Sequence, residues 1–115
     1  MSEATIDVPT FEALQQTAGA EFVGELVDTF LEEAPAMMSE LRDTLAAGNA
    51  DGFRRAAHSL KSNSLTFGAT RLGAMARDLE LGGLDRVRDA GGEQLDALAA
   101  EYAQVAAALT ELRNA

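Results

Sequence analysis

Apolar residues near the C-terminus recur at alternating steps of three and four positions. They are Leu95, Leu98, Tyr102, Val105, Leu109 and Leu112. Such steps return to the same face of an α-helix, and a sustained seam of this kind is typical of helices packed in bundles. Alanine occurs 23 times and leucine 15 times, whereas aromatic residues make up only 5% of the chain. Because alanine and leucine favour helices, we expect the chain to be nearly all helix.

In the first half of the chain we expect a short helix and a long one. Thr10 is the predicted N-cap of the short helix, which ends near Gly19. The long helix covers about residues 20–47, and Pro35 is expected to kink it or to split it near Ala34. Its predicted inner face consists of Phe22, Leu26, Phe30, Met37, Leu41 and Leu45. Gly48 suits a helix end, and Asn49 suits the N-cap of the next helix.

The second half predicts three more helices, over about residues 50–67, 70–81 and from 95 onward. Gly68 is the expected stop of the first, and Leu72, Met75 and Leu79 are expected to point inward from the second. The pattern over residues 84–92 leaves two alternatives open, a helical turn or a glycine-rich connection. Short loops make neighbouring helices antiparallel. The predicted fold class is therefore all-α, an antiparallel up-down four-helix bundle with a short extra N-terminal helix.

Length and composition bound the possible functions. A chain of 115 residues is expected to be one domain, residues 1–115, with its bundle at about 10–113. The absence of cysteine excludes a thiolate zinc site and a cysteine nucleophile. No apolar run approaches the ~18 residues of a membrane span, and the N-terminus does not resemble a signal peptide. We expect a cytoplasmic protein without membrane partners. A net charge of −10 opposes nucleic-acid binding.

Charge is unevenly distributed along the chain. The segment from residue 52 to residue 77 contains five basic residues and no acidic residue, whereas the rest contains four basic and nineteen acidic residues. The five are Arg54, Arg55, Lys61, Arg71 and Arg77. The only histidine, His58, lies inside this basic block. A cluster of this kind is more often a solvated surface than a site, so the direction of His58 becomes the deciding question.

Helical geometry places His58 on the outer face of its predicted helix. The expected core side consists of Phe53, Ala56, Ala57, Leu60, Ser64 and Phe67. At ~100° per residue, His58 lies roughly 160° from the centre of that side. Arg54, Lys61, Ser62 and Leu65 share its outer face, since they stand one or two turns away. An exposed imidazole can take up a phosphoryl group covalently, with charge from Lys61 and a small hydroxyl from Ser62 beside it.

Residues 57–68, AHSLKSNSLTFG, resemble the signature of histidine-containing phosphotransfer (HPt) domains. That signature is His-x-Leu-Lys-Gly, with a second glycine ten residues after the histidine. The segments 30–35 and 79–80 also agree, and the resemblance covers about residues 10–112. It implies a four-helix bundle in which Nε2 of His58 accepts a phosphoryl group from the aspartyl phosphate of a receiver domain.

The same resemblance implies roles for neighbouring residues. Lys61 would steady the phosphoryl charge, Gly68 would close the helix, and Ser62 stands where the family usually has glycine. We expect Arg54, Arg55, Leu65 and Gly68 to form the partner-docking face and the helix end.

Mg²⁺ would belong to the receiver, so no cofactor or metal is expected on this chain. The expected partners are receiver domains of response regulators and of a hybrid histidine kinase, and the expected form is a monomeric carrier rather than an enzyme.

Two other classes of function remain as alternatives. One is a helical docking module, or an inhibitor of a kinase or receiver, that is never phosphorylated. The other is a small enzyme with His58 as general base, which needs a carboxylate to orient the ring. Residues 52–77 offer none, although another helix could supply it.

Overall fold

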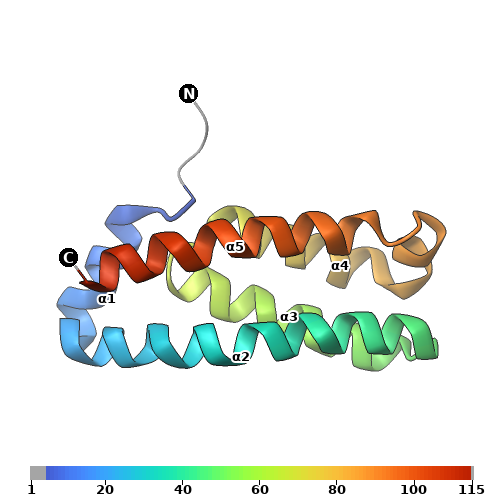
Figure 1. The fold of residues 1–115 in the computed structure, drawn as a ribbon, viewed down its shortest axis with the longest axis horizontal. Helices are drawn as coiled ribbons and strands as arrows, with labels where there is room; N and C mark the ends of the chain where they lie inside the picture. The colour runs from blue at the N-terminus through green and yellow to red at the C-terminus, as the bar shows by residue number, and fades with distance from the viewer. Residues whose placement is uncertain (1–4, 115) are drawn as a thin grey trace.

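The computed structural model describes residues 5–114, which form five α-helices and no strand (Figure 1). The helices are α1 (Val8–Ala18), α2 (Ala20–Ala47), α3 (Ala50–Thr66), α4 (Thr70–Asp89) and α5 (Glu93–Asn114). Helices α2 to α5 run lengthwise through the molecule, and α1 crosses one end near the C-terminus (Figure 1). This arrangement confirms the predicted all-α helical bundle. No helix among the described residues is long and apolar enough to cross a membrane.

Helix α1 begins earlier than the sequence predicted. Its N-cap is Asp7, whose side chain accepts a hydrogen bond from the backbone N–H of Thr10 at 3.3 Å. Pro9 occupies the first turn, where its fixed φ angle and missing N–H cost nothing. The prediction of Thr10 as the cap was therefore wrong, because an aspartate three residues upstream takes that position. Gly19 ends the helix as expected.

Helix α2 continues through Pro35 without a split. Proline lacks the N–H that would bond the carbonyl of Leu31, four residues earlier. In this fold the hydroxyl of Tyr102 on α5 donates to that carbonyl at 3.4 Å. A neighbouring helix thus supplies part of what the proline removes, and the expected division near Ala34 does not occur.

The buried face of α2 also differs from the prediction. Phe30 and Leu41 are buried as expected, but Phe22 is 52% exposed. The remaining buried positions are Val23, Val27, Ala34 and Thr44. Phe22 and Val23 are adjacent and both apolar, so the sequence pattern allowed two faces about 100° apart. Packing buries Val23 in place of Phe22, whereas the predicted Leu26, Met37 and Leu45 are partly buried against the core.

The other helix boundaries largely follow the sequence. Gly48 adopts a left-handed conformation (φ 71°, ψ 24°), and Asn49 caps α3 by accepting from the N–H of Gly52 at 3.0 Å. Segment 84–92 is resolved as helix up to Asp89 followed by a turn. Gly83 breaks the helical geometry of α4 (φ 80°, ψ 173°) at the place where the predicted helix was to end.

The core lies between α2, α3, α4 and α5. The α5 seam is confirmed, since Leu95, Leu98, Val105 and Leu109 are buried. Phe30 joins two of the other elements, because its ring lies 5.4 Å from that of Phe67 and 6.0 Å from that of Tyr102. Phe67 is the C-cap residue of α3, so its contact with Phe30 ties the end of α3 to α2.

Candidate functional site

The two faces of α3 are sharply divided. All residues of the predicted core side are buried, namely Phe53, Ala56, Ala57, Leu60, Ser64 and Phe67. The hydroxyl of Ser64 donates to the carbonyl of Leu60 at 2.6 Å, which satisfies the only polar side chain on that face. On the opposite face, 57% of the His58 side chain is exposed. The outward direction of His58 predicted from helical spacing is confirmed.

Glu80 on α4 brings a carboxylate to this face. Its Oε2 lies 2.8 Å from Nδ1 of His58, and its Oε1 lies 2.8 Å from Nζ of Lys61. The Glu80 side chain is 16% exposed, and that of Lys61 is 23% exposed. One carboxylate thus holds two side chains of α3 from the neighbouring helix.

The charge state of Glu80 follows from these contacts. The pKa of Glu80 lies below its usual value of 4.5. The contact with Lys61 lowers it most, and the contact with His58 lowers it second most. Burial raises the pKa, but its effect is smaller than that of either contact. The Lys61 contact is an ion pair without hydrogen-bond geometry, since Oε1 is buried and receives no directed hydrogen bond within residues 5–114. Glu80 is therefore a carboxylate at neutral pH.

This carboxylate also sets the orientation of the imidazole. An ionised carboxylate only accepts hydrogen bonds, so Nδ1 of His58 carries the hydrogen in the contact with Oε2. In the neutral ring, Nε2 then keeps its lone pair. Because Nδ1 is turned toward α4, Nε2 points away from Glu80. This orientation leaves Nε2 able to act as a nucleophile.

The residues predicted to surround His58 on the docking face are exposed. Arg54, Arg55 and Ser62 are exposed, and Leu65 is 47% exposed. Arg54 pairs with Asp51 at 3.6 Å, and the side chain of Arg55 lines a hollow between α2 and α3. The exposed Leu65 side chain rests on Gly73 of α4, where any Cβ would lie 2.6 Å from its Cδ2. These four residues share the side of α3 that carries His58.

Gly68 is placed elsewhere. It ends α3 with φ +82°, but it is buried under the N-terminal segment. The N–H of Asp7 donates to the carbonyl of Gly68 at 2.7 Å, and a Cβ on Gly68 would lie 2.8 Å from the carbonyl oxygen of Asp7. The expectation of Gly68 at a helix end agrees with this geometry. A place on the exposed docking face does not, because residues before α1 cover it.

Sequence reasoning did not assign a role to Glu80. Residues 52–77 contain no carboxylate to orient the ring, and Glu80 lies just beyond them on another helix. A signal was present in the turn between α3 and α4. His58 and Glu80 each stand eleven residues from Ala69, and an antiparallel pair of helices brings such positions together.

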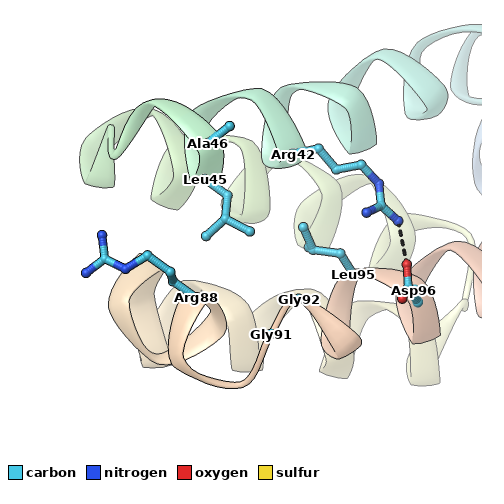
Figure 2. A pocket seen from close by; sticks show the side chains of 8 residues that line it. All are labelled: Arg42, Leu45, Ala46, Arg88, Gly91, Gly92, Leu95 and Asp96. Carbon is cyan, nitrogen blue, oxygen red and sulfur yellow. Dashed lines mark hydrogen bonds and ion pairs between the residues drawn. The ribbon is translucent and has the colours of Figure 1, made fainter.

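A pocket lies away from these residues (Figure 2). It has a volume of about 420 Å³ and is bordered by α2, the end of α4, the turn before α5 and the first residues of α5. Arg42 and Asp96 form an ion pair of 3.0 Å at one side of it. None of the predicted site residues lines this pocket. Among the described residues, no group of three or more histidine or acidic side chains is placed to hold a metal ion.

Comparison with known proteins identifies the class of this chain. The family model for the Hpt domain matches residues 25–115, so the chain belongs to the Hpt domain family. It is a histidine-containing phosphotransfer domain, a class of phosphocarrier that works in phosphorelays with receiver domains as partners.

Among solved structures, the chain is similar to histidine-containing phosphotransfer protein B (HptB) from Pseudomonas aeruginosa. The two share 27% sequence identity and superpose with a TM-score of 0.85, over 98% of this chain and 97% of that one. A comparison with curated protein sequences found no match.

Proposed function

We propose that His58 accepts a phosphoryl group on Nε2 from the aspartyl phosphate of one receiver domain and passes it to another. The observation that carries this proposal is the half-exposed ring whose Nδ1 is held by Glu80 at 2.8 Å. An imidazole fixed in this way offers its second nitrogen to a partner without needing a pocket of its own. The first receiver belongs to a hybrid histidine kinase or response regulator, and the second to another response regulator.

The chemistry needs only one new bond on this chain. The lone pair of Nε2 attacks the phosphorus, the bond from phosphorus to the aspartyl oxygen breaks, and its electron pair returns to the aspartate. The proton on Nδ1 stays in place, so the ring gains a positive charge that faces Glu80. Phosphoryl transfer depends mainly on positioning and charge, and the receiver supplies Mg²⁺ and its acidic residues. Lys61, one turn from His58, adds positive charge to this face from its position against Glu80 and so steadies the phosphoryl charge without leaving that contact.

The surface around His58 suits a receiver whose active site is acidic. Arg54 and Arg55 supply positive charge, Leu65 supplies an exposed apolar contact, and Ser62 leaves space beside the ring. We propose that the chain acts there as a monomeric carrier, with no ATP turnover of its own.

Intact mass tests this function directly. The protein is mixed with phosphorylated receiver domains and Mg²⁺, beside the His58→Gln variant. We expect a gain of a single phosphoryl group that is lost in acid, is stable in base and is absent from the variant. If no receiver from the same cell transfers a phosphoryl group, His58 is a contact residue and the protein is a docking module.

A further inference from the structure

Glu80 contacts the side of the imidazole opposite the proposed phosphoryl acceptor atom. We propose that the Glu80 carboxylate controls how readily the phosphoryl group leaves His58, by keeping Nδ1 protonated after phosphorylation. This inference rests on the proposed function and extends it from uptake of the phosphoryl group to its release. It makes Glu80 a positioning residue whose charge, and not only its shape, matters.

Phosphorylation of Nε2 changes the charge of the ring that Glu80 contacts. With phosphorus on Nε2 and hydrogen on Nδ1, the imidazole is a cation. Oε2 of Glu80 faces this cation and lies 2.8 Å from Nδ1. An opposite charge this close favours the charged form of a group. When the phosphoryl group moves to an acceptor, the P–N bond breaks and its electron pair returns to Nε2. The ring then leaves as neutral imidazole and keeps its Nδ1 hydrogen.

Loss of the Nδ1 proton would change the leaving group. An unprotonated phosphorylated ring must depart as an imidazolate anion, which is a far poorer leaving group than neutral imidazole. A neutral residue at position 80 could accept the same hydrogen bond, but it would not stabilise the ring cation. The charge of Glu80 is therefore expected to keep the phosphohistidine in its reactive form at neutral and mildly basic pH.

Lys61 keeps the carboxylate available for this role. Its Nζ lies 2.8 Å from Oε1, and that oxygen is buried with no hydrogen bond from the described residues. If Lys61 moved away to follow the phosphoryl group, it would leave a buried carboxylate oxygen without a partner, which is costly. Lys61 is thus held at Glu80 and favours its ionised form. Glu80 therefore uses one carboxylate oxygen for each contact: Oε1 for the ion pair with Lys61 and Oε2 for the imidazole of His58.

The other charged groups near His58 do not duplicate Glu80. Arg54, Arg55 and Lys61 lie on α3, and Arg77 precedes Glu80 on α4. From α2, Glu40 lines the hollow that also contains Arg55 and Ser59. Among the described residues, Glu80 supplies the carboxylate that contacts the imidazole. Glu40 is therefore a matched control, since its change to glutamine removes the same charge without touching the ring.

Chemical loading of His58 makes the test independent of any partner. The wild type, Glu80→Gln and Glu40→Gln are phosphorylated with phosphoramidate, and loss of the phosphoryl group to water is followed by intact mass. At about pH 8 we expect the phosphohistidine of Glu80→Gln to last about tenfold longer than that of the wild type. At about pH 6 the two lifetimes should converge, because protons from solution replace the effect of the carboxylate. Glu40→Gln should match the wild type at both values.

Equal lifetimes at about pH 8, or a shorter lifetime for Glu80→Gln, would overturn the inference. A second measurement needs no variant: ¹⁵N chemical shifts of the phosphorylated wild-type imidazole report the Nδ1 proton. A ring without that proton at about pH 8 would also overturn it. If phosphoramidate loads His58 but no receiver does, the proposed function fails while the lifetimes still decide the role of Glu80.

Discussion

The two faces of α3 differ in what holds them and in what they offer. The inner face is closed by apolar side chains, and its one polar group, Ser64, is satisfied within the helix. The outer face carries His58, which is fixed at one ring nitrogen by a residue of another helix. Stability is thus concentrated on one side of the helix and reactivity on the other. This division predicts that substitutions on the two faces will affect different measurements.

The largest loss of stability is expected on the inner face. Leu60 is fully buried, and Leu60→Ala removes apolar contacts and leaves a cavity. The expected cost is about 2–5 kcal/mol in the free energy of unfolding. Urea unfolding followed by circular dichroism measures it. Leu65→Ala is the matched control on the outer face, and a control that costs as much as Leu60→Ala would contradict the division.

A smaller loss is expected at the end of α3, where the N-terminal segment covers Gly68. Gly68→Ala places a side chain in a left-handed conformation and sets its Cβ 2.8 Å from the carbonyl oxygen of Asp7. Gly83→Ala is the control, because it is also strained (φ +80°) but meets nothing within 4 Å. Backbone strain of this kind costs on the order of 1–3 kcal/mol, and Gly68→Ala adds the clash.

Hydrogen exchange separates these two glycine variants. The amide of Asp7 bonds to Gly68, so its protection should fall in Gly68→Ala and persist in Gly83→Ala. Retained protection of Asp7 in Gly68→Ala would show that the N-terminal segment is not held by this contact.

The contact between α4 and the outer face of α3 predicts a pH dependence. The folded pKa of Glu80 lies below its ordinary value of 4.5, so its stabilising contribution is complete above that value and is lost as the pH falls through the folded value. The difference in stability between the wild type and Glu80→Gln should therefore shrink in acid. Urea midpoints between about pH 7 and about pH 3 measure it, with Glu40→Gln as control. A difference that stays constant over this range would argue against the ion pair.

The sequence was most informative where the pattern is local. The division of α3 into two faces needs only the spacing within one helix, and it was predicted correctly from Phe53 to Phe67. The same reasoning succeeded only in part for α2, because Phe22 is exposed and its neighbour Val23 is buried instead. Phe22 and Val23 offer two apolar faces, and only packing against other helices selects one. Pro35 was expected to kink or to split α2, and no split occurs. The Tyr102 hydroxyl that offsets its missing N–H lies seventy-one residues from Leu31.

The candidate site was predictable in part for the same reason. His58, Lys61 and Ser62 lie within two turns of one helix, so spacing alone placed them together. Glu80 comes from another helix, and its contact depends on the length of the α3–α4 turn and on the rotation of both helices. Gly68 was expected at the helix end and grouped with the docking face, because the sequence does not show that Asp7 folds back over it.

The smallest change in stability is expected for the residue that matters most to the proposed function. His58→Gln alters a side chain that is 57% exposed, so the free energy of unfolding should change by no more than about 0.5 kcal/mol. A thermal melt beside Leu60→Ala measures the contrast. If His58→Gln proved the more damaging of the two, the imidazole contact with Glu80 would be a structural tie, and the outer face of α3 would contribute to stability as the inner face does. A small change in melting temperature together with a complete loss of phosphoryl uptake would place the function of this helix on a face that its fold does not need.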